Sequence, residues 1–417
     1  MNIYLLILLI FAQPLSLGDC IQMALEHNPA LIRAQEEVKK REAEFSLGVS
    51  EFLPQIRTSM GYTKYSDEYR YYGEPKTYTN YFSLSQKIFD PSTSFTTLGK
   101  KKLKDASKES MVAIRADVIL SVDEAFFELA RGEKFLEIAE LILKRSEEEY
   151  KKTVTMVELG SASKLDLLRR EVDISEQRLE LAKAEKDRAI AEARLCKEMG
   201  IEPISIEIID ETIDPEPIKV SLDTLTEKAL RERPEIKAKR LELAYYRDIH
   251  KSAYTNYLPT ISLTSNYGYE GNRFPRESSL WDKNDSWNIG INLTFGLFTG
   301  IGRHQTVRYA ESDIYIKEQE LKEVRLDITL DVREAYLSIV NAEKELELIE
   351  RNLEAAEENY KYVIEFYKLG ASTTLELLDA EESLRRANYR RIDALYNWKL
   401  AELKLKRAIG ETESNSL

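Results

Sequence analysis

The chain has 417 residues, with 60 basic and 73 acidic side chains and a formal net charge of −13. This acidic balance argues against a nucleic-acid-binding protein, because such proteins need basic surfaces that neutralise phosphates. The two cysteines, Cys20 and Cys196, provide neither a disulfide framework nor a zinc-binding spacing, and the three histidines are scattered. No metal site and no cofactor site are therefore expected.

The N-terminal segment has the pattern of an export signal. Residues 3–12 form one apolar run, too short to span a bilayer and about the length of a signal-peptide core. We expect 1–16 to be a signal peptide, with cleavage near Ala12 or Ser16. Asp19 precedes Cys20 where a lipoprotein signal requires a small residue, so Cys20 is interpreted as a small helix residue and not a lipid anchor. No later apolar run is long enough for a transmembrane helix.

Two parts of the sequence resemble each other. The segment SLGDCIQMALEHNPAL at 16–31 matches SLDTLTEKALRERPEI at 221–236, and Leu159-Gly160 to Gly200 matches Leu369-Gly370 to Gly410. A repeat of this length is a duplicated domain and not a solenoid period. We divide the chain into a first repeat, a proline-containing linker, a second repeat and a tail, at 17–202, 203–220, 221–410 and 411–417.

Each copy is expected to begin with a helix and to end with a very long helical hairpin. Proline is absent from 92–202 and after 275, and Gly160 and Gly370 are the only glycines within 133–199 and 303–409. These spans are rich in strong helix formers. The sequence predicts a long helix followed by a return helix in each copy, at 91–158 and 161–199, then at 303–368 and 372–409. At 1.5 Å per residue, each return helix is about 60 Å long and the first long helix about 100 Å.

The second return helix carries two apolar flanks. One is a coiled-coil seam with 3-4 spacing, interrupted only by Arg391: Leu377, Ala380, Leu384, Ala387, Ala394, Trp398, Ala401, Leu405 and Ala408. The other is Leu375, Leu378, Tyr389, Ile392, Tyr396 and Leu403. Two flanks predict two packing neighbours, as in a ring of helices. An ordinary coiled-coil bundle explains the seam equally well.

Two segments predict β-hairpins, at about 54–89 and 258–299. Residues 287–298, WNIGINLTFGLF, alternate between apolar side chains and small or polar ones, which is typical of a transmembrane β-strand. Residues 61–82 add seven tyrosines, suggesting an interfacial girdle: Tyr62, Tyr65, Tyr69, Tyr71, Tyr72, Tyr78 and Tyr81. A soluble β-sandwich also alternates. However, the chain offers only two hairpins, and nothing obvious covers their apolar faces.

Four strands cannot close a membrane barrel, and open strand edges are not tolerated in lipid. The chain is therefore expected to assemble with cyclic symmetry. A dimer would provide eight strands and a trimer twelve, and the residues alone do not choose between them.

The whole mature chain resembles the TolC family of outer-membrane efflux and secretion ducts. The resemblance is carried by MALEHNPAL, by EFLPQI and NYLPTI before the hairpins, and by ELGSASKLDLL and KLGASTTLELLDAEESL at the helix turns. It implies a mainly α protein with membrane β-strands. The expected assembly is a homotrimeric duct with a twelve-stranded β-barrel in outer-membrane lipid and a long α-helical barrel in the periplasm. The linker and chain ends would build an equatorial domain.

Such ducts join a periplasmic adaptor protein and an inner-membrane transporter, and they pass substrates without chemistry. The chain is accordingly expected to be no enzyme, and its cargo cannot be read from the sequence. A periplasmic adaptor, a structural coiled-coil protein and a secreted enzyme are the alternatives. The adaptor would lack amphipathic hairpins, the coiled-coil protein would lack tyrosine-rich strands, and the enzyme would need a catalytic constellation that is not found.

Three groups of residues are expected to act in such a duct. Leu159-Gly160 and Leu369-Gly370 would form adaptor-contacting periplasmic tips, because glycine at a helix end permits a left-handed turn. Resemblance to the family places a closing latch at Asp166 and Tyr367, with a second latch reduced because Ser372 replaces an arginine. It also places a periplasmic gate at Glu376 and Asp379, whose i, i+3 spacing puts both carboxylates on one helix face. The first copy has a mixed pair there, Asp166 and Arg169.

Overall fold

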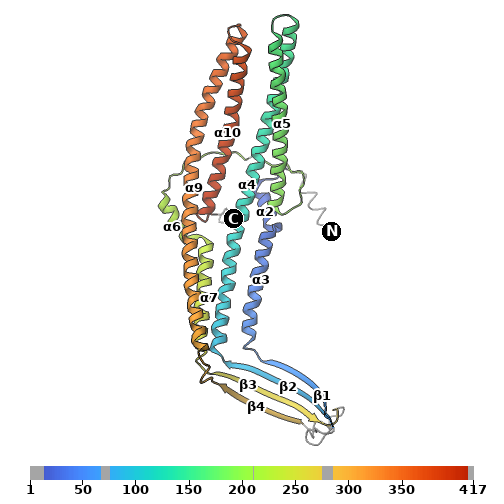
Figure 1. Cartoon of the computed structure of the whole chain (residues 1–417), viewed down its shortest axis with the longest axis vertical. Helices are drawn as coiled ribbons and strands as arrows, with labels where there is room; N and C mark the ends of the chain where they lie inside the picture. Colours follow the sequence, from blue (N-terminus) through green and yellow to red (C-terminus); the bar gives the residue numbers. More distant parts are fainter. Residues whose placement is uncertain (1–13, 67–75, 210, 275–284, 412–417) are drawn as a thin grey trace. The chain divides into compact units, whose positions relative to one another are not determined.

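The computed structural model describes residues 14–66, 76–209, 211–274 and 285–411, and it is mainly helical (Figure 1). The order helix, helix, strand, strand, helix, helix occurs twice. The first series is α2 (Leu17–His27), α3 (Pro29–Ser50), β1 (Gln55–Lys64), β2 (Lys76–Phe89), α4 (Pro91–Glu158) and α5 (Lys164–Met199). The second is α6 (Leu222–Glu232), α7 (Pro234–Thr255), β3 (Thr260–Gly271), β4 (Asp285–Thr294), α9 (Gly302–Lys368) and α10 (Thr374–Ala408).

The long helices lie close to their expected positions. Helix α4 has the expected bounds and starts behind Asp90, whose side chain accepts a hydrogen bond from the Thr93 amide at 3.1 Å. The two return helices begin a few residues later than expected, because Ser163 and Thr373 serve as their N-caps. A capping residue has extended backbone angles, so the helix can start only after it.

The chain folds as two compact units that do not coincide with the two sequence repeats. The first unit comprises Met1–Gln35, Met111–Pro234 and Arg325–Leu417, and the second comprises Glu36–Ser110 and Glu235–Val324. Each unit therefore contains segments of both repeats, because α3, α4 and α9 continue from one unit into the other.

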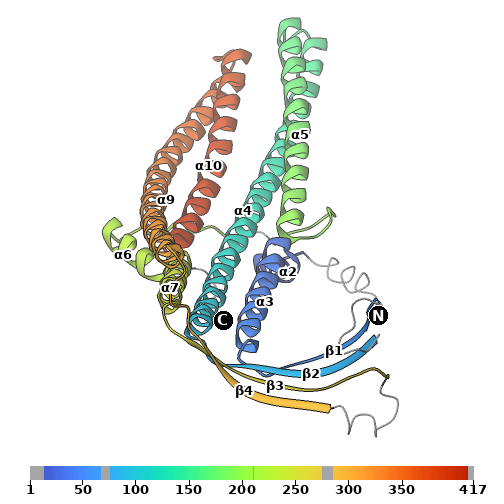
Figure 2. The same ribbon diagram turned by 60° about the horizontal axis from the view of Figure 1, so that its bottom comes forward.

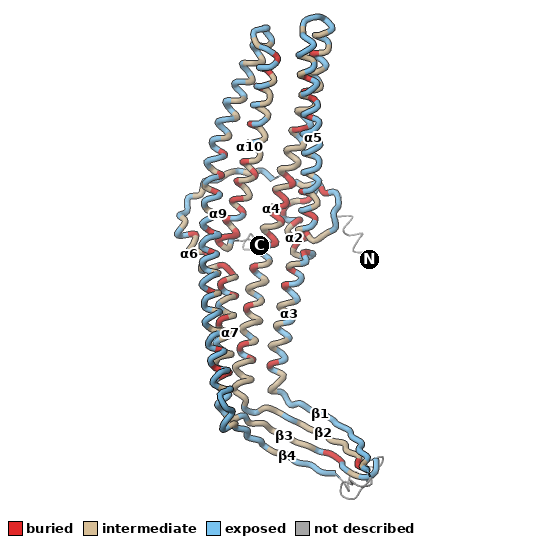
Figure 3. The backbone as a smooth tube through the Cα atoms, in the orientation of Figure 1, coloured by how far each residue is buried: buried red, intermediate tan, exposed pale blue. Residues whose placement is uncertain are grey.

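The core of the first unit forms where α2, α4, α5 and α10 meet. Val122, Phe126 and Leu129 of α4 are completely buried, as are Leu195 and Met199 of α5. The red segments of α2, α4 and α5 in Figure 3 mark this core. Burial of these apolar side chains is the main favourable contribution to folding of this unit.

The beginning of the described chain is built into this core. Leu15 is buried, its amide donates to the Glu207 carbonyl at 2.8 Å, and Ser16 is the N-cap of α2. Cys20 is fully buried inside α2, and burial raises the pKa of its thiol to about 12. A lipidated Cys20 would become the first residue and would lose the contacts of Leu15 and Ser16.

Both expected flanks of α10 are used. Most seam residues are buried, Leu384 is partly buried and Arg391 is exposed. Helices α9 and α10 lie side by side in Figures 1 and 2. On the other flank, Tyr396 is part of the core beside Phe127, and the rings of Tyr389 and Phe135 are 5.3 Å apart. Helix α10 thus contacts α4 of the other repeat, whereas Leu375 near the helix start is exposed.

The second unit contains a four-stranded antiparallel sheet in the order β1-β2-β3-β4. The strands confirm the two expected hairpins, and β1 and β4 form the sheet edges. The expected strand at 287–298 was too long, since β4 ends at Thr294. Beyond this point Arg303 Nη1 donates to the Gly296 carbonyl at 2.6 Å, so this carbonyl is bonded to a side chain. Tyr69, Tyr71 and Tyr72 lie outside the described residues.

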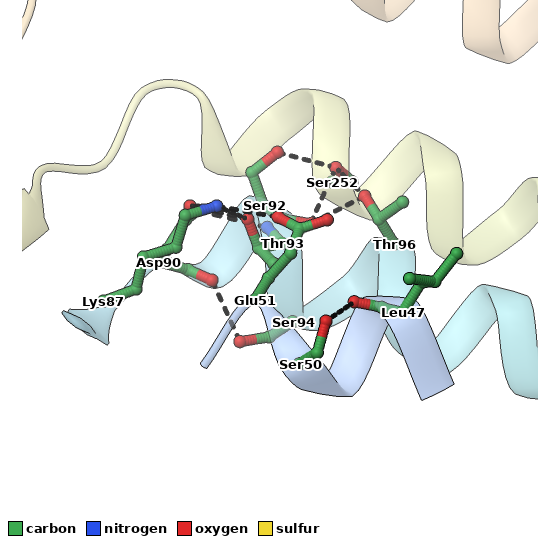
Figure 4. Close-up of polar contacts among 10 residues, drawn as sticks. All are labelled: Leu47, Ser50, Glu51, Lys87, Asp90, Ser92, Thr93, Ser94, Thr96 and Ser252. Carbon is green, nitrogen blue, oxygen red and sulfur yellow. Dashed lines mark hydrogen bonds and ion pairs between the residues drawn. The ribbon is translucent and has the colours of Figure 1, made fainter. Parts of the chain in front are cut away.

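A polar cluster joins this sheet to its helices. Lys87 at the end of β2 donates to Glu51 at 2.8 Å and to Thr93 at 3.0 Å, and it lies 3.3 Å from Asp90 (Figure 4). Beside it, the buried Ser252 of α7 exchanges a hydrogen bond with Ser92. The cluster therefore connects the end of β2 to Glu51, which follows α3, and to the first turn of α4. That turn of α4 in turn contacts α7 through Ser252.

Candidate functional site

The sheet has two chemically different faces across all four strands. The register places most apolar and aromatic strand residues on one face, named here the apolar face: Ile56, Met60, Tyr62, Tyr78, Phe82, Leu84, Ile261, Leu263, Tyr267, Trp287, Ile289, Ile291 and Leu293. Tyr81 is an exception, because it pairs with Ser59 on the opposite face. Residues of the other face, named the polar face, include Arg57, Ser59, Ser83, Ser85, Thr264, Asn266, Asn288, Gly290 and Asn292. Alternation of this kind separates two environments by the thickness of one strand layer.

The apolar face is open to its surroundings. Trp287 is 74% exposed and Ile291 is 72% exposed. On the polar face, by contrast, Asn266 donates to Asn288 at 3.1 Å and Asn292 donates to Thr264 at 2.9 Å. A continuous exposed apolar surface requires a lipid or protein partner, whereas the polar face suits water. Among the described helices, none combines the length and apolar character needed to cross a membrane.

The two turns between long helices have almost the same local structure. Gly160 and Gly370 have φ angles of 73° and 71°. In each turn the residue after the glycine donates back across the helix end, from Ser161 to the Met156 carbonyl and from Ala371 to the Phe366 carbonyl. The preceding leucines are open, with Leu159 77% exposed and Leu369 80% exposed. Each turn therefore presents an apolar side chain and a bare backbone, which suits contact with another protein.

The acidic residues expected to act near these turns have a local role as well. Glu376 closes a capping box in which its Oε2 accepts from the Thr373 amide and from Ser372 Oγ, both at 2.7 Å. The Thr373 backbone bond and then the Ser372 bond lower the pKa of Glu376. Asp379 lies one turn further along and is exposed, like Glu376. These hydrogen bonds therefore favour the ionised form of Glu376 at the start of α10.

The expected latch is not formed within one chain. Asp166 occupies the equivalent capping position of α5, and the hydrogen bond from Ser163 is the main cause of its lowered pKa. Thr374 at the start of α10 and Arg169 also interact with this carboxylate. Tyr367 is half-buried, and no hydrogen bond joins it to Asp166 in the described part of the chain.

A buried ion pair between the return helices was not foreseen. Arg170 of α5 is 2% exposed, and its Nη1 donates to Glu381 Oε2 of α10 at 2.8 Å. Arg385 lies 3.7 Å from Asp173 beside this pair. Burial raises the pKa of Glu381, and nearby Asp173 adds to the increase while Arg170 opposes it. The only sequence signal is that Arg170 shares the helical stripe of Ile174 and Gln177, which are also buried.

No cluster of three or more histidine, cysteine, aspartate or glutamate side chains suited to a metal ion occurs in the described ranges. The features that stand out are thus the two-faced sheet, the helix turns and the charged contacts between α5 and α10.

Comparison with known proteins gives a consistent result. A family described as "Outer membrane efflux protein" matches residues 20–200 and 225–411. The chain is 25% identical over 405 residues to the outer membrane protein TolC of Vibrio cholerae, covering 95% of this chain and 90% of the relative. It is 25% identical over 402 residues to the protein CyaE of Bordetella pertussis, covering 95% and 84%. The Campylobacter jejuni CmeC outer membrane channel has a similar fold, with a TM-score of 0.84, 17% identity and coverage of 96% and 88%.

Proposed function

Because this chain belongs to the outer membrane efflux protein family, we propose that it forms the exit duct of a tripartite efflux pump or a type I secretion system. Substrates would pass from a periplasmic adaptor and an inner-membrane transporter to the cell exterior, without chemistry. The observation that carries this proposal is the sheet, whose apolar face is exposed while its polar face suits a wet lumen.

We propose that three chains close one barrel. The edges β1 and β4 of each sheet would pair with neighbouring copies, because unpaired edges are unstable in lipid. Exposed apolar side chains on the long helices support lateral packing between copies, notably Leu168, Val172 and Leu179 of α5 and Leu330 and Leu337 of α9. The helices would then form the periplasmic α-helical barrel, and the repeated element order supports an internal duplication.

The experiment that tests this function is reconstitution. The protein should require detergent for extraction from the outer membrane, migrate as a heat-resistant trimer and conduct ions in planar bilayers. An adaptor or a structural coiled-coil protein would be extracted without detergent and would produce no channels. The two-faced sheet favours the duct over both alternatives, since each lacks a use for an exposed apolar strand face.

Substitution of the tip glycines should abolish export while leaving trimers intact. A Cβ atom at Gly160 or Gly370 would meet no atom within 4 Å, so a bulky side chain fits the chain itself. It would obstruct a docking adaptor and strain the left-handed backbone by about 1–2 kcal/mol. Dye efflux by cells whose only copy is Gly160→Trp/Gly370→Trp measures the effect.

Gly300→Trp is the matched control, because Gly300 also has a positive φ and open surroundings but lies outside the tips. Normal efflux by the double tip variant would show that the two glycines are only helix ends.

Loss of the Tyr367 hydroxyl should increase leak through the closed duct. Asp166 is held by Ser163 and Thr374 of its own chain, so we propose that the latch joins it to Tyr367 of a neighbouring copy. A carboxylate accepts a tyrosine hydroxyl well. Single-channel recording should show a higher resting conductance for Tyr367→Phe. The control is Tyr362→Phe, which alters an exposed tyrosine of the same helix; equal conductance in both variants would exclude the latch.

A further inference from the structure

Two lysines lie directly opposite each other at one end of the sheet, where β1 ends and β2 begins. Along the chain, this end is farther from α3 and α4 than the opposite end of the two strands. Lys64 ends β1, Lys76 begins β2, and the register pairs them. Both side chains are exposed. Like charges at directly opposite positions destabilise a strand pair. The two ammonium groups therefore favour an anion bound between them.

Both lysines lie on the apolar face, because Lys64 is two residues after Tyr62 and Lys76 is two residues before Tyr78. The rings of Tyr62 and Tyr78 are 5.0 Å apart, and Phe274 meets Tyr78 edge to face at 5.9 Å. Lys76 Nζ lies 5.9 Å from the centroid of the Tyr78 ring. Cationic and aromatic groups are thus combined on the face that we assign to lipid.

These aromatic residues line an open cavity of about 320 Å³, together with Met60 and Asn80. Asn80 stands opposite Met60 and Tyr269, so it is a polar residue on the apolar face. Its Oδ1 atom is buried and has no hydrogen-bond partner in the described part of the chain. A buried polar atom of this kind normally has a partner, so it indicates a missing donor. Lipid tails cannot supply one, whereas a hydroxyl group can.

We propose that this cavity binds the phosphorylated sugar headgroup of an outer-leaflet glycolipid. The phosphate would lie between Lys64 and Lys76, a sugar ring would stack on Tyr62 and Tyr78, and a sugar hydroxyl would donate to Asn80. The proposal deepens the proposed function, because only a duct with periplasmic helices places this end of the sheet at the outer leaflet. A glycerophospholipid offers the phosphate but no ring for the aromatic groups.

Native mass spectrometry of the intact assembly tests the site with lipid A, monophosphoryl lipid A and phosphatidylglycerol as probes. Lipid A should bind most tightly, and Lys64→Gln/Lys76→Gln should weaken it about tenfold or more, since each lysine near a membrane surface contributes about a factor of five. Asn80→Leu should lower the preference of lipid A over phosphatidylglycerol. Lys39→Gln/Lys40→Gln is the matched control, removing two exposed lysines from α3.

Equal lipid A affinity in the Lys64→Gln/Lys76→Gln variant would overturn the site, and so would equal binding of phosphatidylglycerol and lipid A by the unaltered protein. A soluble phosphorylated glucosamine that competes as well as lipid A would also contradict a membrane ligand. Conductance in planar bilayers keeps the two proposals separate. If channels form normally but Lys64→Gln/Lys76→Gln leaves lipid A affinity unchanged, only the proposed lipid site is contradicted. If the unaltered protein forms no channels, the proposed duct function is contradicted.

Discussion

Replacing Arg170 by methionine is expected to lower the free energy of unfolding by about 3 kcal/mol, because the partly buried Glu381 would lose its partner. Arg170 Nη1 and Glu381 Oε2 are 2.8 Å apart, and the arginine has almost no contact with solvent. Methionine retains much of the apolar volume, so the loss reports mainly on the charge. Guanidinium-induced unfolding followed by circular dichroism measures this difference in the free energy of unfolding. The dependence of that free energy on denaturant concentration should be the same in both proteins.

The double variant Arg170→Met/Glu381→Leu should recover most of this loss, because apolar replacement of a whole buried pair is often neutral. Arg178→Met is the control, since Arg178 forms an exposed pair with Glu147 at 3.2 Å and should cost under about 1 kcal/mol. Equal losses in the single and double variants would assign the effect to packing and not to charge.

The destabilisation by Arg170→Met should shrink at lower pH. Burial raises the folded-state pKa of Glu381 above its unfolded value, and removal of Arg170 should raise this pKa further. Between the two pKa values the folded protein binds more protons than the unfolded one. The contribution of Glu381 to stability therefore improves as pH falls through the folded pKa. The gap between variant and unaltered protein should be smaller at about pH 5 than at about pH 7.5.

Removing the charges of Glu376 and Asp379 should abolish cation selectivity and block by a trivalent cation applied from the periplasmic side. In the proposed trimer, three copies of each exposed carboxylate would ring the pore, and such rings bind cations. The capping box changes the design of this experiment, because alanine at Glu376 would also damage the start of α10. Glutamine can still serve the cap, so Glu376→Gln/Asp379→Asn removes charge while retaining the helix start.

Single-channel recording should show block weakened at least about tenfold in this variant, with selectivity close to neutral. The matched control is Glu354→Gln/Glu357→Gln, which removes two exposed carboxylates with the same i, i+3 spacing from α9. Unchanged block in Glu376→Gln/Asp379→Asn would show that the gate lies elsewhere. Equal weakening in the control would indicate a general surface-charge effect.

The long helices were predictable because the residues at their ends indicate where each helix starts and stops. Asp90-Pro91 and Leu159-Gly160 mark the two ends of α4, and the structure places the helix between them. The strands were likewise located by alternation, which depends only on neighbouring residues. The late starts of α5 and α10 were missed, because the capping boxes at Ser163 and Thr373 were not recognised.

Contacts between the two repeats could not be read from the sequence. Arg170 and Glu381 are 211 positions apart, and each is one of many charges on a helix surface. The capping role of Glu376 was missed for another reason: a gate, which remains a prediction, and a helix cap both require a carboxylate near a helix start. Which helix face meets which neighbour depends on packing across the whole unit, and periodicity along one helix does not determine it.

The central strand pair of the sheet has a consequence for biogenesis. Strand β2 pairs with β3, and Tyr81 donates to Glu270 across 189 positions of sequence. Closing a loop of that length costs about 5 kcal/mol of chain entropy before any pairing repays it. Pairing of the first hairpin with β3 therefore waits until the chain has been synthesised and exported as far as Gly271, about two thirds of its 417 residues. During that delay its apolar side chains remain an aggregation hazard, which makes the nascent chain a natural client for holding chaperones.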